Sequence, residues 1–362
     1  MKRLLILLTL FALLLALLPG CGSGKTALTG ETVIFTDSAG RKVEVPAEIT
    51  RVAPSGAVAA MFLASVCPEY MVCIASTPSS AQYKYLDQSL IRLPTTGQLY
   101  GSKSTINLEA LSSAKPQVII DLGDAKDGIS RDMNSLQKQT GIPVVFIEAD
   151  LEHMAQAFRM LGELLHGKED RCGELAAYVE ETVALARENS GKIPEAERLT
   201  VMYTTGVSGL NTNASGSTQA QVLPLVGAVN AIVVEDVSDR GGGNTISLEQ
   251  MFNFDPDVIL FTVGSMYADA AGDKSWSQLR AIQNGDYYEI PGLPYNWMSS
   301  PPSLNMLLGI RWLGNLLYPR IYDYDMAAEA QRAYKLLWDY DLSPEEAEDM
   351  LKNSTGKRGS GS

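Results

Sequence analysis

Aromatic side chains gather where apolar runs that predict strands come to an end. The residues concerned are Tyr83, Tyr85, Tyr100, Tyr203, Tyr267, Tyr295 and Trp297. Phenol and indole rings suit a large flat ligand, and a phenolate oxygen is also a ligand for ferric iron. Each ring can equally serve ordinary wall or core packing. The pattern therefore predicts a site for a flat or iron-containing small molecule, with packing as the alternative for any single ring.

Positive charge is sparse in the same loops. Lys103 and Arg240 stand beside Gly- and Ser-rich sequence, although either can be a solvated surface residue. Ser55 and Asn211 complete the candidate ligand-binding residues. Asn211 belongs to residues 204–218, whose hydroxyls, amides and glycines can present donors to an oxyanion or form a surface loop. The small number of positive charges favours a neutral or weakly charged chelate as the ligand. The polar loop leaves oxyanion binding as an alternative.

Composition and charge exclude several classes of protein. The chain has 362 residues, 46% of them hydrophobic, which supports large folded cores. Its net charge of −13 argues against nucleic-acid binding, which needs clustered Lys and Arg. The only histidines, His153 and His166, form no His-rich cluster, and no nucleophile, base and orienting group occur together. We expect no catalytic residue, no resident metal and no cofactor.

Strand and helix patterns alternate along the chain and must position these loops. An early hairpin is predicted by the apolar run 33–35 and the alternating residues 43–45 around the turn 37–40. Further strand-like runs follow at residues 71–75, 118–120, 144–147, 200–203 and 258–261. Such alternation predicts an α/β fold with mainly parallel sheets.

One segment is repeated at an offset of 140 residues. Residues 105–121 read TINLEALSSAKPQVIID, and residues 245–261 read TISLEQMFNFDPDVILF. In each copy Thr is expected to cap a helix, Glu109 or Glu249 falls in its first turn, and proline stops it before a strand. We interpret the copies as parts of two related lobes.

The segment between the copies predicts the connection of the lobes. Residues 151–190 show helical spacing of apolar side chains, with Gly167 as a candidate break, and predict a linker helix. The first lobe is then expected at 31–150 and the second at 191–350, ending in helices near 304–317 and 326–338. Residues 351–362 are expected to be a disordered tail.

The N-terminus predicts export. Residues 1–20 carry a basic start and an apolar run of 15 residues, which is too short to span a membrane comfortably. Residues 21–30 then suit a flexible spacer. Among the later cysteines, Cys67 and Cys73 are close enough in sequence to pair, or both are free buried thiols.

The chain resembles the substrate-binding lipoproteins of bacterial ABC importers for ferric siderophores, haem or cobalamin in four features of its sequence. They are the opening Asp37, Gly40, Arg41, Val43 and Pro46, the duplicated L-E-x-[LM] followed by P-x-V-I, the helix between lobes, and the segment W-x-x-x-P-P-S-L-N at 297–305. Residues 18–21 also resemble the lipoprotein cleavage box, so Cys21 is the expected lipidation site, with an ordinary cleaved signal as the alternative. This resemblance implies two lobes, each a mainly parallel sheet with flanking helices, joined by one long α-helix, and a ligand between them.

The resemblance also implies the partners. A family member delivers its small-molecule ligand to an ABC permease dimer with its ATPase, docking through one exposed Glu per lobe, here Glu109 and Glu249. The alternative is that each Glu only complements its helix N-terminus. We expect a monomer outside the cytoplasm, held to the membrane by lipid alone. The ligand is expected to be a ferric chelate, haem or a corrinoid; molybdate- or tungstate-type oxyanion binding and an extracellular enzyme on the same scaffold stay open.

Overall fold

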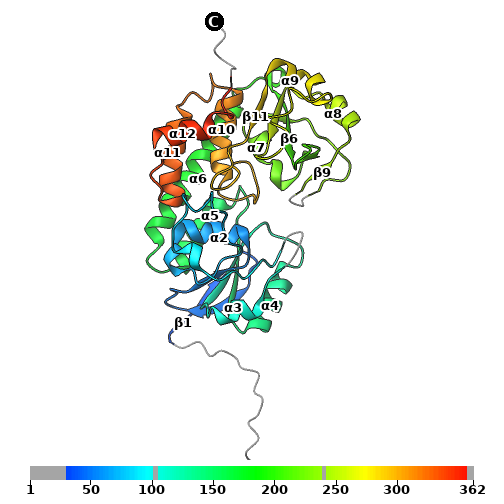
Figure 1. The fold of residues 1–362 in the computed structure, drawn as a ribbon. Coiled ribbons are helices and arrows are strands. Elements are labelled where there is room, and N and C mark those ends of the chain that lie inside the picture. Colours follow the sequence, from blue (N-terminus) through cyan, green and yellow to red (C-terminus); the bar gives the residue numbers. More distant parts are fainter. Residues whose placement is uncertain (1–29, 101–104, 239–241, 357–362) are drawn as a thin grey trace, which may run out of the picture.

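The computed structural model describes residues 30–100, 105–238 and 242–356, which fold into two α/β lobes (Figure 1). The first lobe has a parallel sheet in the order β3-β4-β5 and a separate hairpin, β1-β2. Its elements are β1 (Thr32–Thr36), β2 (Lys42–Pro46), β3 (Val52–Pro54), α2 (Ala57–Val66), α3 (Leu108–Ser113), β4 (Val118–Gly123), α4 (Ile129–Thr140), β5 (Val144–Glu148) and α5 (Met154–Leu164).

The second lobe is built on a sheet in the order β11-β10-β6-β7-β9, with β8 also paired to β6. The contacts among β8, β6, β10 and β11 are parallel, and those of β7 are antiparallel. The strands are β6 (Thr200–Thr205), β7 (Asn211–Thr212), β8 (Val229–Asn230), β9 (Asn244–Thr245), β10 (Val258–Phe261) and β11 (Tyr287–Glu289). The helices are α7 (Val222–Leu225), α8 (Leu248–Phe254), α9 (Arg280–Asn284), α10 (Met306–Leu317), α11 (Met326–Trp338) and α12 (Pro344–Leu351). The predicted fold class is thus confirmed.

Both faces of each sheet are covered, which explains why the strands read as apolar runs. Val118 and Ile120 of β4 pack in the same core as α2 and α5, whereas Ile119 between them packs with α3 and α4. In the second lobe, Leu260 of β10 faces the core that holds α7 and α10, and Ile259 faces α8 and α9. Within the described parts of the chain both sheets are thus covered on each face, so the ends of their strands are the expected place for a ligand.

The predicted hairpin is present, and its charged motif explains the turn. Asp37 Oδ1 accepts hydrogen bonds from the backbone N–H groups of Ala39 and Arg41, and Arg41 forms an ion pair of 2.9 Å with Asp37. Gly40 has a φ of +72° that favours glycine. The Arg41 guanidinium also donates to Val144 O at 3.0 Å, which ties the hairpin to β5.

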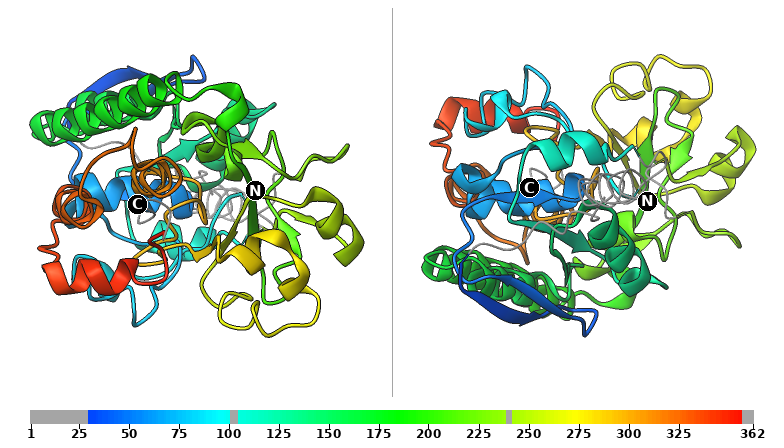
Figure 2. Two further views of the ribbon diagram at one scale, coloured as in Figure 1. Left: turned by 90° about the horizontal axis from the view of Figure 1, so that it is seen from above. Right: turned by 90° about the horizontal axis from the view of Figure 1, so that it is seen from below.

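The stretch expected to be one linker helix is two helices. The chain turns after α5, where Gly167 has a φ of +80°, and returns along α5 as α6 (Glu169–Ser190). In the first lobe α5 packs on β5, and ring contacts join Phe158 of α5 to Phe62 of α2. The chain therefore passes from the first lobe to the second through α6, which runs along one side of the molecule and is seen in green in Figures 1 and 2.

Three smaller expectations are corrected. Residues 71–75 form isolated bridges, Val52 to Met71 and Ile74 to Thr95, in place of a strand. The helix α12 was not expected. The start of the expected tail is ordered, because Ser354 is 2% exposed and its carbonyl accepts a hydrogen bond of 2.7 Å from the indole of Trp312. Residues 1–29, with the predicted signal, spacer and Cys21, lie outside the described residues.

The three described cysteines, Cys67, Cys73 and Cys172, are buried free thiols, so the alternative of a Cys67–Cys73 disulfide is not realised. Burial raises the pKa of Cys73 to about 11, which keeps its thiol protonated and unreactive. Over the described ranges, we find no helix with the length and apolar character that a membrane span requires.

Candidate ligand-binding site between the lobes

A cavity of about 390 Å³ has walls from both lobes. This volume lies in the usual range for small-molecule sites. The first lobe contributes Ser55, Gly56, Ala57, Val58, Ala59, Gln98, Tyr100, Asp121, Leu122, Gly123, Asp124 and Lys126, and the second contributes Thr218, Gln219, Ser300, Pro301 and Pro302.

Parallel pairing of β3 with β4 positions the polar floor of this cavity. The backbone N–H of Ser55, directly after β3, donates to Ile120 O at 3.0 Å, which continues the ladder by one residue. Ser55 therefore lies beside Asp121, near the carboxyl end of β4, and its hydroxyl donates a hydrogen bond to Asp121 Oδ1. Both side chains are buried, at 2% and 5% exposure. The strand ends thus place a hydroxyl and a carboxyl together on the cavity wall.

Burial dominates the electrostatics of Asp121. Loss of solvent raises the pKa of this carboxyl to about 6, against the lowering effects of the Ser55 hydrogen bond and the Lys126 charge. Among the ion pairs of the described residues, none includes Asp121. The cavity therefore holds a carboxyl group that is ionised at neutral pH and has no contacting cation among the residues that the structure describes.

Tyr100 and Lys126 form the adjoining wall. The Lys126 ammonium lies 3.7 Å from the centre of the Tyr100 ring, and the Tyr100 hydroxyl donates to Asp132 Oδ2 at 3.2 Å. Burial first, then the negative charges of Asp121 and Asp132, raise the pKa of Tyr100 well above its usual value. The phenol therefore stays protonated in the unliganded protein.

The start of α2 supplies hydrogen-bond donors to the same cavity. Residues 57–59 line the wall, no side chain caps this helix, and its first turn contains no acidic residue. The first N–H groups of a helix have no partner within the helix, so they suit an acceptor oxygen. The cavity thus combines backbone donors with the carboxylate acceptor of Asp121.

The structure brings two of the predicted ligand-binding residues, Ser55 and Tyr100, to this cavity. Tyr203 and Trp297 are enclosed in the core at 0% exposure, and the Tyr203 hydroxyl pairs with Ser299 Oγ at 2.8 Å. The prediction that these two rings face a ligand is wrong for this structure, because Tyr203 belongs to the interior strand β6 and the Trp297 ring packs against Tyr334 of α11.

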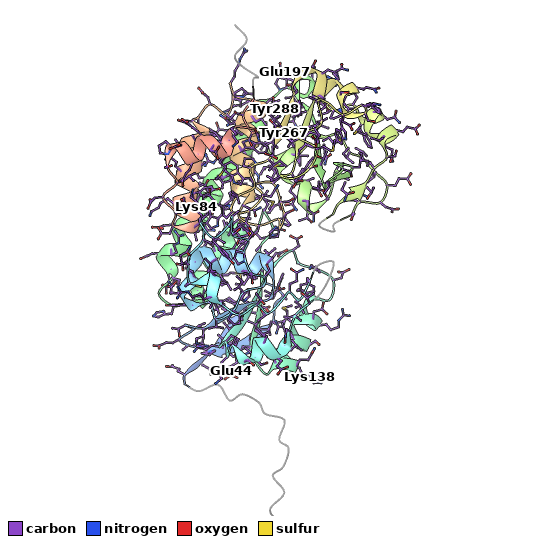
Figure 3. All side chains as sticks on the ribbon, in the orientation of Figure 1. Glu44, Lys84, Lys138, Glu197, Tyr267 and Tyr288 are labelled. Atoms are coloured by element: carbon purple, nitrogen blue, oxygen red, sulfur yellow. The ribbon has the colours of Figure 1, made fainter. Side chains whose placement is uncertain are left out.

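The other predicted aromatic residues also serve packing. Tyr85 is buried, its ring 5.0 Å from that of Tyr340. Tyr295 packs against Trp338 and lines a separate small cavity of about 80 Å³. Tyr267 packs on Tyr287, and Figure 3 places it in the part of the second lobe that lies far from the first.

The remaining candidates are Tyr83, which is half-buried, Asn211, Lys103 and Arg240. Tyr83 does not line the inter-lobe cavity. Asn211 belongs to β7 and accepts a hydrogen bond of 3.2 Å from Thr245. Lys103 and Arg240 lie outside the described residues.

Sequence reasoning missed Asp121, although a signal was available. Asp121 ends the first copy of the duplicated segment, and the second copy has Phe261 at the same position. A carboxyl group in an otherwise apolar strand needs a functional or structural partner. Asp124 and Thr218 were not singled out as residues, although Thr218 belongs to the predicted polar loop at residues 204–218 and lines the cavity.

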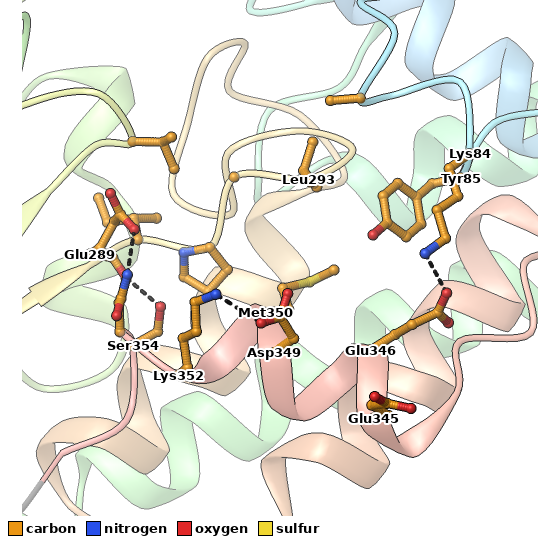
Figure 4. A pocket seen from close by; sticks show the side chains of 16 residues that line it. Lys84, Tyr85, Glu289, Leu293, Glu345, Glu346, Asp349, Met350, Lys352 and Ser354 are labelled. Carbon is orange, nitrogen blue, oxygen red and sulfur yellow. Dashed lines mark hydrogen bonds and ion pairs between the residues drawn. The ribbon is translucent and has the colours of Figure 1, made fainter.

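A larger cavity, about 530 Å³, lies between residues 81–85, the end of β11 and α12 (Figure 4). Both of its lysines are paired: Lys84 with Glu346 at 2.5 Å, and Lys352 with Asp349 at 2.8 Å. Its other carboxylates are the half-buried Glu289, which accepts a hydrogen bond from Asn353, and the exposed Glu345. We favour the smaller inter-lobe cavity as the ligand site, because it lies at the carboxyl ends of β3 and β4 and its carboxylate, Asp121, is buried.

Glu148, Asp150 and His153 come together at the end of β5. The Nδ1 atom of His153 lies 2.8 Å from Asp150 Oδ1 and 3.8 Å from Glu148 Oε1. The hydrogen bond to Asp150 raises the pKa of His153. An ion pair beside the start of α5 accounts for this cluster.

Glu109 and Glu249 are both exposed in the first turns of α3 and α8, as predicted. The residues that cap these helices are Asn107 and Ser247, two positions after the predicted threonines. Asn107 Oδ1 accepts from Ala110 N at 2.9 Å, and Ser247 Oγ accepts from Gln250 N at 3.1 Å. One exposed carboxylate on each lobe is thus a consequence of the duplication.

Two related lobes with a polar cavity between them define a binding protein. A family model described as periplasmic binding protein matches residues 57–293. The chain belongs to this family, which consists of solute-binding proteins and not enzymes.

Some of the proteins to which this chain is similar carry the name of their ligand. The chain is 23% identical over 193 residues to the Fe(3+)-citrate-binding protein YfmC of Bacillus subtilis, a match that covers 52% of this chain and 58% of that protein. Among solved structures, an ABC transporter solute binding protein from Sulfurospirillum deleyianum has a TM-score of 0.80 at 27% identity, covering 88% of this chain and 99% of the other. The molybdate periplasmic binding protein MolA of Haemophilus influenzae has a TM-score of 0.67 at 20% identity, covering 86% and 99%.

Proposed function

We propose that this chain is the substrate-binding component of an ABC importer, and that it captures an iron chelate in the cavity between its lobes. The observation that carries the proposal is the cavity itself, which is of ligand size and has polar walls from both lobes. Family membership and the relatives that bind ferric citrate or serve ABC transporters support it.

Within this proposal a compact chelate fits better than haem or a corrinoid. Of the aromatic residues expected to hold a flat ligand, only Tyr100 lines the cavity, and its hydroxyl is engaged by Asp132. A flat macrocycle would find few rings on which to stack among the described residues.

Oxyanion binding is the second candidate, favoured by one observation. The uncapped start of α2 offers N–H groups of the kind that bind oxyanions. The neighbouring carboxylate of Asp121 opposes a dianion in the same cavity, so we place this candidate second.

To deliver the ligand, we propose that the protein contacts a permease dimer through Glu109 and Glu249. Both are exposed and lie on different lobes, so together they can meet paired arginines of a two-fold partner. One chain supplies both walls of the cavity, so a monomer suffices. Lipidation of Cys21 would hold the protein outside the cytoplasm at the membrane.

Thermal-shift titration of the purified chain tests the proposal. The panel contains ferric citrate, a ferric hydroxamate, haemin, cobalamin, molybdate and tungstate. A saturating ligand raises stability by RT ln(1 + [L]/Kd), and we expect saturation with an iron chelate. Saturation with molybdate or tungstate alone would select the oxyanion function, and no response to any of them would overturn the proposed ligand class.

A further inference from the structure

Asp121 has the properties of a ligand-recognition group. The residue is 5% exposed, and its carboxyl lies on the wall of the inter-lobe cavity and accepts a hydrogen bond from Ser55. A carboxylate has about four lone-pair positions, so one hydroxyl leaves acceptor capacity unused. A buried carboxylate is costly unless it is paired, and it is therefore poised for a donor that enters with the ligand.

Among the described residues, the charged groups around Asp121 do not neutralise it by contact. Lys126 stacks on the Tyr100 ring, and Asp132 is bound by the Tyr100 hydroxyl. Asp124, a second carboxylate on the same wall, accepts a hydrogen bond from Thr218. The described wall of the first lobe thus carries two carboxylates and one ammonium group, which disfavours an anionic ligand.

We propose that Asp121, held by Ser55, is a subsite for a cationic hydrogen-bond donor on the ligand, such as a pendant ammonium group. This inference rests on the proposed function and narrows it: the chain prefers iron chelates that carry a positive group over anionic ones. The N–H groups at the start of α2 meet acceptor oxygens of the same ligand, and Asp121 supplies the charge selectivity. A charge-assisted hydrogen bond away from water is stronger than a neutral one, so the preference is large enough to measure.

A matched pair of chelates isolates this contact. Ferrioxamine B carries a free ammonium group, and its N-acetyl derivative is the same ferric trihydroxamate without that charge. Dissociation constants for both, and for ferric citrate, are measured by calorimetry on the wild-type chain, Asp121→Asn and Asp127→Asn. Asp127 is exposed, does not line the cavity, and loses the same charge on substitution.

We expect the wild-type chain and Asp127→Asn to bind ferrioxamine B about tenfold more tightly than its acetylated form, and Asp121→Asn to bind the two about equally. A preference that is absent in the wild type, or that survives in Asp121→Asn, overturns the inference and leaves the proposed function intact. Failure of the wild type to bind any of the three chelates counts against the proposed function itself.

A further measurement keeps the inference testable if Asp121→Asn fails to fold. In the wild type, the preference is expected to fall between about pH 8 and about pH 4.5, because protonation removes the charge of Asp121. A preference that stays constant over this pH range overturns the inference.

Discussion

Thr218 of the second lobe donates a hydrogen bond of 3.3 Å from Oγ1 to Asp124 Oδ2 of the first lobe. Both residues line the inter-lobe cavity, so the lobes contact each other at the site itself. The helix α6 joins the lobes elsewhere, along the side of the molecule. Ligand binding and the relative position of the lobes are therefore expected to be coupled through this contact.

Replacement of Thr218 by Val should weaken chelate binding about three- to tenfold, because it removes one hydrogen bond between the lobes. Ser215→Ala, an exposed change in the neighbouring turn, serves as the control and should have no effect. Calorimetric titration with a ferric hydroxamate measures both. Equal affinity for wild type and Thr218→Val would show that the contact does not contribute to binding.

Asp121 should make stability depend on pH in an unusual direction for a carboxyl group. Its pKa is raised to about 6 in the folded chain, so ionisation destabilises the fold above that pH, and the destabilisation disappears as the pH falls toward 4. Asp121→Asn should therefore be more stable than wild type at pH 8, by on the order of 2–3 kcal/mol, with the difference shrinking toward pH 4. Urea unfolding at several pH values measures it, and a less stable variant at pH 8 would contradict the assignment.

Charge reversal at Glu109 and Glu249 together should abolish stimulation of the cognate permease ATPase and leave chelate affinity unchanged. The reason is that both carboxylates are exposed and neither lines the cavity. Glu163→Arg, an exposed change on α5, is the control and should retain stimulation. Full stimulation by the double variant would show that docking uses other residues.

Two substitutions of helical glycines by alanine should change the free energy of unfolding in opposite directions. A Cβ atom on Gly309 of α10 would lie 2.1 Å from the carbonyl oxygen of Trp297, so Gly309→Ala should destabilise the chain by more than about 2 kcal/mol. Gly173 of α6 is exposed with open space around it, and Gly173→Ala should stabilise by up to about 1 kcal/mol. Chemical denaturation compares them, and a neutral Gly309→Ala would contradict the packing of α10 against residue 297.

The sequence predicted the strands and the family well, because a buried parallel strand has a distinctive apolar composition. Residues 118–120, 144–147, 200–203 and 258–261 all fall within strands. The prediction of one continuous linker helix was wrong because α5 and α6 show the same helical spacing of apolar residues. The two helices are separated by the turn at Gly167.

The binding site was harder to predict than the fold. Apolar periodicity does not show whether an aromatic residue at a strand end packs inward, as Tyr203 does, or faces the cavity, as Tyr100 does. The pairing of Asp124 with Thr218 depends on how two lobes sit together, over a separation of 94 residues. Asp121 left a signal in the sequence, through its contrast with Phe261 at the same position of the second copy.

The central claim is that the inter-lobe cavity binds the ligand, and filling each of the two cavities in turn with a tryptophan side chain tests it most directly. Ala57 lines the inter-lobe cavity, and Ala81 lines the larger cavity beside α12. Ferric citrate and ferrioxamine B are titrated into wild type, Ala57→Trp and Ala81→Trp, with circular dichroism as a check of folding. We predict that Ala57→Trp folds and loses chelate binding, whereas Ala81→Trp binds like wild type. Retained binding in a folded Ala57→Trp, with loss in Ala81→Trp, would contradict the assignment of the ligand site.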